Sequence, residues 1–119
     1  MSDISLVEYM RFLASNGVSL AALGIHDVAL RRDDTLRAAT LLRTARVPIL
    51  GGDVYFRRAN RIEYAYANWH ADAKSTEDRD TYLHRSWEMT EKYVKEFPDA
   101  QGTEILFSLV TGESKRGQS

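Results

Sequence analysis

The side chains of this sequence that could do chemistry are three histidines and the carboxylates near them. There is no cysteine, which excludes disulfides, thiol catalysis and cysteine-ligated zinc. The run Trp69-His70-Ala71-Asp72 could place an imidazole and a carboxylate at a sheet edge for acid–base catalysis. His84 has Asp80 and Glu88 one helical turn away on either side, which is the spacing of a metal site on a helix. These two arrangements form an enzyme hypothesis.

Each of these signals also has a structural interpretation, which we favour. The row around His84 would lie on a solvated helix face without a pocket, and His26-Asp27 suits a surface or capping pair. Gly51-Gly52-Asp53 resembles a phosphate loop, but a strand follows where such a loop requires a helix. The two glycines instead predict a bulge or close packing under an aromatic ring, which we assign to Tyr66. We therefore expect no catalytic residue, no metal and no cofactor.

Charge argues against nucleic acid as the partner. Arg57, Arg58 and Arg61 cluster near aromatic residues, as in a platform for single strands, yet the net charge is −1. That total divides into +3 over residues 1–61 and −4 over residues 62–119. The acidic second half indicates a basic protein partner.

Length and hydropathy limit the possible domain organisation of the chain. At 119 residues and 44% hydrophobic composition, we expect one domain over residues 1–111 and a flexible polar tail over residues 112–119. No signal-like segment and no long apolar run is visible, so we expect a cytoplasmic protein without a membrane partner.

Capping signals and apolar spacing predict helices over 5–16, about 34–46 and 75–97. The segment 19–30 is ambiguous, with a short helical turn followed by an extended stretch at 28–30. In the third helix one apolar stripe should be buried, consisting of Leu83, Ser86, Trp87, Thr90, Val94 and Phe97.

Three β-branched and aromatic segments predict strands, at 48–57, 62–69 and 104–110. We expect the first two to form a hairpin with a three-residue loop, because that register sets Phe56 opposite Ile62. The predicted fold class is α+β, with helices packed on one face of a small, mainly antiparallel three-stranded sheet.

In this register the helices would cover a face that carries Val54, Phe56, Ile62, Tyr64 and Tyr66. The other face would show aromatic rings beside carboxylates, a composition typical of protein interfaces, unless a loop or the N-terminal segment covers it. The candidate partner-binding residues, from this face and the end of the second strand, are Asp53, Tyr55, Glu63, Tyr66, Trp69, His70 and Asp72.

Three runs of sequence, 29–36, 47–55 and 62–69, together resemble the bacterial immunity protein 40 family. The resemblance extends from about residue 17 to about residue 110. Its most specific parts are Ile-Leu-Gly-Gly-Asp-Val-Tyr and the Tyr-x-Asn-Trp ending of the second strand. The chain departs from the family pattern at His70, where an aromatic residue is usual.

The resemblance implies a cytoplasmic α+β protein without catalytic activity that protects by binding a cognate protein toxin. A basic, nuclease-like toxin would suit the acidic second half, and we expect a monomer or a weak homodimer. Two alternatives stay open: a small enzyme that uses His70 and Asp72, and a non-catalytic module that forms homo-oligomers through its open sheet face.

Overall fold

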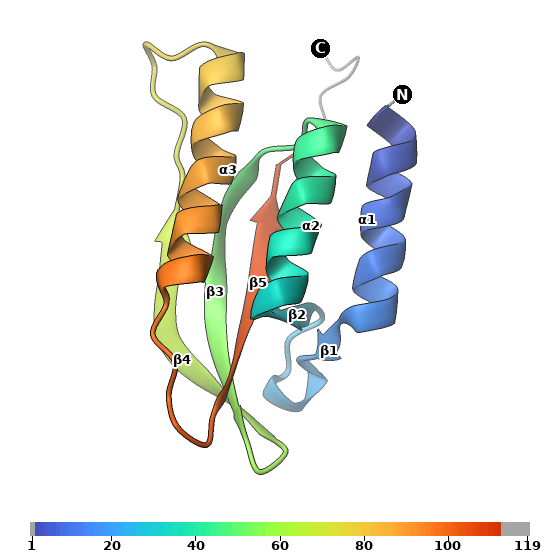
Figure 1. Ribbon diagram of the computed structural model, residues 1–119, viewed down its shortest axis with the longest axis vertical. Coiled ribbons are helices and arrows are strands. Elements are labelled where there is room, and N and C mark those ends of the chain that lie inside the picture. Colours follow the sequence, from blue (N-terminus) through green and yellow to red (C-terminus); the bar gives the residue numbers. More distant parts are fainter. Residues whose placement is uncertain (1, 113–119) are drawn as a thin grey trace.

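The computed structural model describes residues 2–112, with side chains from residue 6 onward (Figure 1). Within this range three α-helices form one layer on one face of a five-stranded sheet, in the order β1-β2-β5-β3-β4 (Figure 1). All neighbouring strands are antiparallel. The elements are α1 (Ser2–Asn16), β1 (Val18–Ser19), the 3-10 helix η1 (Ala21–Leu23), β2 (Val28–Arg31), α2 (Arg32–Ala45), β3 (Ile49–Arg58), β4 (Arg61–His70), α3 (Arg79–Glu96) and β5 (Glu104–Thr111).

The α+β class is confirmed, but the expected three-stranded sheet is wrong. The two additional strands, β1 and β2, come from the ambiguous connector, where Val18 pairs with Ala29. Leu30 of β2 then pairs with Phe107 of β5, a neighbour far along the chain. The extended stretch at 28–30 was predicted, whereas its place in the sheet depends on this distant partner.

The buried residues of the helices agree with the predicted apolar stripes better than the first residues of the helices agree with the predicted starts. In α3 the residues Leu83, Ser86, Trp87, Thr90 and Val94 are all buried, as predicted, whereas Phe97, at the C-cap, is half-buried. The helix begins at Arg79, because Asp78 caps it by accepting a 2.8 Å hydrogen bond from the Thr81 backbone N–H. The capping box predicted at Ser5 is wrong, since α1 already begins at Ser2.

The β3–β4 hairpin has a two-residue loop, so the predicted three-residue loop is wrong. Arg58 pairs with Arg61 across Ala59 and Asn60, which have φ of 48° and 67°. Two left-handed residues form the tight turn that matches the twist of paired strands. A one-residue change of loop length moves every side chain of β4 to the opposite face.

This register sets Glu63 opposite Phe56 on the helix side of the sheet. The pairing of a carboxylate with an aromatic ring is less favourable than the predicted pairing of Phe56 with Ile62. The carboxylate is accommodated because Arg58 donates a 2.8 Å hydrogen bond to it. The pair lies near the hairpin tip, which extends past the ends of the helices (Figure 1). Local pairing of charges at the tip therefore offsets the poor match with Phe56.

A bulge interrupts β4 farther from the turn. Tyr55 pairs with Tyr64, and the next pairs toward the other end are Asp53 with Asn68 and Gly52 with Trp69. β4 thus contains two more residues than β3 over this stretch, and Tyr66 takes a left-handed φ of 57°. After the bulge Trp69 faces the helices.

Trp69 is a core residue, so its predicted role in partner binding is wrong. Its side chain is 6% exposed, and its indole N–H donates a 3.0 Å hydrogen bond to the Thr90 hydroxyl of α3. The ring stacks on Tyr93 at 4.6 Å and lies directly over Gly52. A Cβ on Gly52 would come within 2.3 Å of the ring. The predicted packing of a glycine under an aromatic ring is therefore present, with Trp69 in the place assigned to Tyr66.

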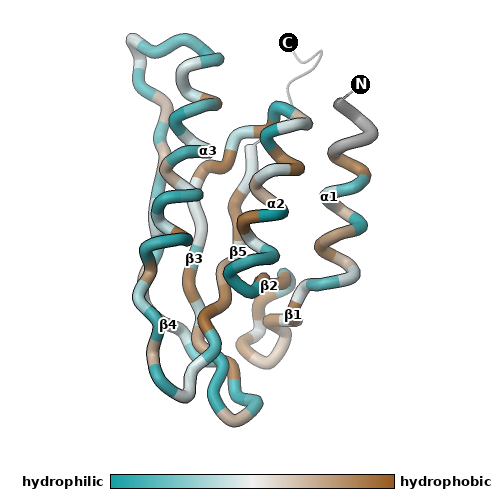
Figure 2. Tube along the Cα trace, viewed as in Figure 1, coloured by the Kyte–Doolittle hydropathy of each residue, from teal (hydrophilic) through white to brown (hydrophobic). Residues whose placement is uncertain are grey.

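The rest of the core lies between the helix layer and the central strands. Figure 2 shows hydrophobic residues along β5 and mostly hydrophilic residues along α3. Val54, Phe107 and Val94 pack together with Trp69, and Trp87 donates its indole N–H to the Val47 carbonyl at 2.8 Å. Trp69 thus joins β4 to α3 through a polar as well as an apolar contact, and Trp87 joins α3 to the connection between α2 and β3.

We predict that Trp69→Ala lowers the free energy of unfolding by about 3–5 kcal/mol, because it leaves a cavity and an unpaired Thr90 hydroxyl. Urea unfolding followed by far-UV circular dichroism measures the change. The matched control, Tyr66→Ala in the same strand, should change stability by no more than about 0.5 kcal/mol, since Tyr66 is 90% exposed. Equal losses in the two variants would contradict the assignment of Trp69 to the core.

Candidate functional site

The side of the sheet away from the helices carries an exposed aromatic surface, which we call the open face. Register places Asp53 between Asn68 of β4 and Ser108 of β5, and the two-residue turn sets Tyr64 and Tyr66 on the same side. Tyr66 is 90% exposed and Tyr64 is 43% exposed. The exposed residues of the open face are Asp53, Tyr64, Tyr66, Asn68 and Val110, whereas Ser108 beside Asp53 is buried.

Three tyrosine rings form a row across this face. The ring centroids of Tyr55 and Tyr64 are 5.8 Å apart, and those of Tyr64 and Tyr66 are 5.7 Å apart. Together with Asp53 and Asn68 the rings line a hollow of about 300 Å³. Burial raises the pKa of Tyr55, and the negative charge of Asp53 raises it further. Tyr55 is therefore a neutral phenol at the base of the hollow.

One end of the sheet surface is covered by the chain itself. Leu20, beside η1, is fully buried and packs with Ala29, Tyr55 and Leu106, with Ile62 at the margin. The expectation that a loop covers this side is thus met at one end of the sheet. Tyr55 supports the open face from below and contributes little exposed surface, because only 5% of it is accessible.

The predicted partner-binding residues divide between several places. Asp53 and Tyr66 lie on the open face, and His70 is exposed on the same side, opposite Gly51. Glu63 is at the hairpin tip, where Arg58 pairs with it, and Trp69 is in the core.

Sequence reasoning missed Tyr64 and Asn68 as residues of this surface. The predicted register placed Tyr64 under the helices and assigned Asn68 to neither face. The signal that could have found them was the loop itself. A two-residue turn at Ala59-Asn60 places the even-numbered residues of β4 away from the helices.

Asp72 lies in the connection between β4 and α3, which Arg85 holds in place. The guanidinium donates to both carboxylate oxygens of Glu77 at 2.7 Å and to the Asp72 carbonyl at 2.6 Å. Tyr82 donates its hydroxyl to the Ala71 carbonyl at 2.6 Å. The hydrogen bonds from Arg85 lower the pKa of Glu77 to about 2. This network fixes the chain that leaves the end of β4.

The histidines have no arrangement typical of catalysis. His70, His84 and His26 are exposed, and none of their side chains makes a hydrogen bond or ion pair among residues 6–112. A catalytic imidazole is normally oriented by a second group. Of the acidic residues beside His84, Asp80 pairs with Arg46. Across the described part of the chain no group of three His, Asp or Glu side chains could hold a metal ion.

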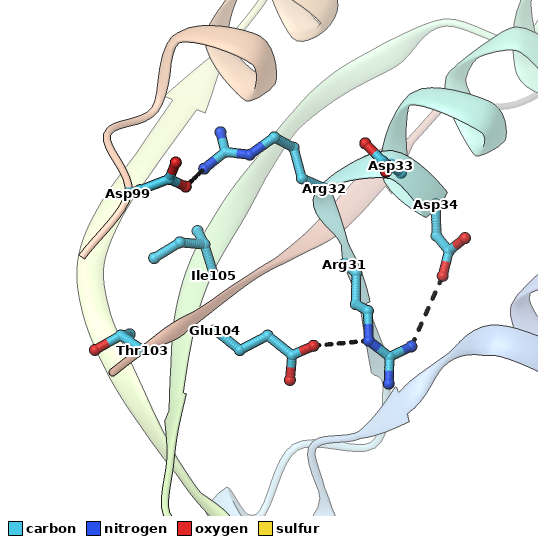
Figure 3. A pocket seen from close by; sticks show the side chains of 8 residues that line it. All are labelled: Arg31, Arg32, Asp33, Asp34, Asp99, Thr103, Glu104 and Ile105. Atoms are coloured by element: carbon cyan, nitrogen blue, oxygen red, sulfur yellow. Dashed lines mark hydrogen bonds and ion pairs between the residues drawn. The ribbon is translucent and has the colours of Figure 1, made fainter. Parts of the chain in front are cut away.

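A second hollow, of about 480 Å³, lies where α2 begins against β5 and the chain that follows α3 (Figure 3). Most of its charged side chains are paired with one another, with Asp33 as the exception among the described residues. Arg32 binds Asp99 at 2.7 Å, and Arg31 binds Glu104 at 2.7 Å (Figure 3). Burial opposes ionisation of Glu104, but hydrogen bonds from Arg57 and Arg31 outweigh it and lower the pKa of this carboxyl. Arg32 thus joins the start of α2 to the chain after α3, and Arg31 and Arg57 join β2 and β3 to β5 through Glu104.

None of the helices in the described range is both long and apolar enough to cross a membrane. The fold and the open face define an α+β protein whose exposed aromatic residues have the composition of a protein-binding surface. The immunity protein 40 family model matches residues 19–111 of the chain. The chain therefore belongs to the immunity protein 40 family, and the predicted resemblance is confirmed. Neither the curated proteins nor the solved structures contained a match.

We predict that the Glu77–Arg85 pair stabilises the protein near neutral pH and loses this effect in acid. The pKa of Glu77 is lowered from 4.5 to about 2, so its contribution is present above the unfolded value. It should fade as pH falls from about 5 toward about 2. Urea unfolding at a series of pH values should show a smaller loss in Glu77→Gln than in the original protein. Glu88→Gln, on the exposed side of α3, is the control and should follow the original curve.

Proposed function

We propose that this protein neutralises a cognate bacterial toxin by binding it through the open face. Family membership supports protection against a toxin as the general role. The observation that carries the choice of surface is Tyr66, which is 90% exposed at the end of the tyrosine row, next to Tyr64. Large exposed aromatic residues in a defined geometry are the common anchors of protein interfaces.

The backbone at Tyr66 strengthens this argument. A residue with a side chain costs about 1–2 kcal/mol in the left-handed region, and Tyr66 has a φ of 57°. Such strain is maintained by the surrounding structure and is concentrated at functional positions. Here the strands on both sides of the bulge are anchored, by Tyr64 pairing with Tyr55 and by Trp69 in the core. The ring is thus presented to a partner in a preorganised position.

Protection by this surface requires no reaction. A toxin bound to the open face would be covered by the strands of the sheet. The strands would then occlude the active site of the toxin or block access to it. We propose a cytoplasmic monomer or weak homodimer in which this contact is the functional event. Within residues 6–112, neither the His70 side chain nor the Asp72 side chain makes a hydrogen bond that would orient it for catalysis. This observation argues against the enzyme hypothesis.

The charges favour a protein with a basic contact surface, such as a nuclease toxin, over nucleic acid itself. Arg57 is bound to Glu104 at 2.6 Å and Arg58 to Glu63 at 2.8 Å, so two of the three arginines near the hairpin tip are already paired. Phosphate binding would have to break these pairs. Asp53, in contrast, lies on the open face with its charge unpaired within the described residues.

We predict that Tyr66→Ala weakens binding of the toxin domain encoded beside this gene by about tenfold or more, because the anchoring ring is removed. Isothermal titration calorimetry with the purified domains measures the affinity, and co-expression in cells that produce the toxin measures protection. Circular dichroism should show that the variant is folded.

Glu88→Ala on α3 is the matched surface control and should bind and protect as the original protein does. The choice of surface would be rejected if Tyr66→Ala binds with unchanged affinity. The proposed function itself would be rejected if the original protein neither binds the toxin domain nor rescues the cells. Light scattering that shows a stable homodimer lost on Tyr66→Ala would favour the oligomerisation alternative.

A further inference from the structure

The hollow beside Tyr66 contains a carboxylate in an unusual position. Asp53 is in the central strand β3, with its backbone paired to Asn68 on one side and to Ser108 on the other. It is exposed, and its carboxylate makes no hydrogen bond or ion pair within residues 6–112. A charged group held on a rigid strand without a partner can bind a ligand at little conformational cost.

Among the described residues, the lining of the hollow contains no basic side chain beside the carboxylate of Asp53. Tyr55 lies within the electrostatic influence of both Asp53 and Asp27, which are among the causes that raise its pKa after burial. On the same side of β3 the next basic residue is Arg57, and Glu104 neutralises it at 2.6 Å. The charge of the hollow is therefore unbalanced, in contrast to the paired charges of Figure 3.

The walls of the hollow are suited to a cation as well. The faces of tyrosine rings attract cations, most strongly when solvent is excluded. Elsewhere in the described chain arginines already use such contacts, with Arg58 5.0 Å from the ring centre of Phe56 and Arg43 5.2 Å from that of Trp87. No side chain of this kind lies over Tyr64 or Tyr66 within residues 6–112.

We propose that this hollow receives an arginine side chain of the toxin, an inference that rests on the proposed function. The guanidinium would donate hydrogen bonds to the Asp53 carboxylate and lie against the rings of Tyr64 and Tyr66. Arginine fits better than lysine because its planar group can pair with a carboxylate and stack on a ring at the same time. At about 300 Å³ the hollow has room for one such side chain.

The first experiment compares Asp53→Asn with Tyr66→Ala in binding to the purified toxin domain. Asp53→Asn keeps the shape of the side chain and removes its charge, so we expect a loss of about tenfold or more that shrinks at high salt. Asp33→Asn, an exposed carboxylate at the start of α2, is the matched control and should bind normally. If Tyr66→Ala loses affinity while Asp53→Asn keeps it, the arginine site is wrong and the open-face interface stands. If neither variant has an effect, the proposed interface is wrong as well.

A second experiment needs no toxin. Nuclear magnetic resonance titration of the protein with N-acetyl-arginine methylamide should shift the amides of Asp53, Tyr66 and Asn68. The uncharged citrulline analogue should leave them unchanged, and the arginine effect should be absent in Asp53→Asn. Equal shifts with both probes, shifts confined to other residues, or no shift at all would overturn the proposal.

Discussion

The packing of Trp69 on Gly52 is the contact on which the rest of the sheet geometry depends. The indole occupies the space that any side chain at position 52 would need, and its N–H reaches Thr90 on α3. Gly52 is also close to the Ser108 carbonyl, so β5 approaches the same point. One ring thereby fixes β3, β4, β5 and α3 relative to one another. Burial of a tryptophan of this size is a large stabilising term for a domain of 119 residues.

This constraint accounts for the form of the open face. The turn at Ala59-Asn60 fixes the register at one end of the hairpin, and Trp69 fixes it at the other. The chain between these two points is longer in β4 than in β3, and the excess is taken up by the bulge at Tyr66. Within the bulge Tyr66 takes a left-handed conformation and is 90% exposed on the open face. The exposed ring is thus a consequence of how the core closes.

The two hollows differ in whether their charged side chains have partners within the protein. Around Arg32 and Glu104 the arginines pair with carboxylates from other parts of the chain, so the ion pairs tie α2 to the chain after α3 and join β2 and β3 to β5. Around Asp53 a charge sits beside three rings and pairs with none of the described residues. A protein that protects by binding needs surface groups that its own fold leaves unsatisfied, and this place on the sheet provides them.

Much of the fold could be read from the residues, because apolar spacing reports burial within one element. The stripe of α3, the inward Ile105 and Phe107, and the outward position of Asp53 follow from such periodicity. The side on which Trp69 and Tyr66 lie could not, because it depends on whether the loop has two residues or three. Ala59 has a left-handed conformation because the tight turn between the paired strands requires it. The sequence by itself determined the class, the family and which rings and carboxylates are available; only the tertiary structure decided that Trp69 is buried and Tyr66 exposed, since strand register is set by contacts across the whole sheet.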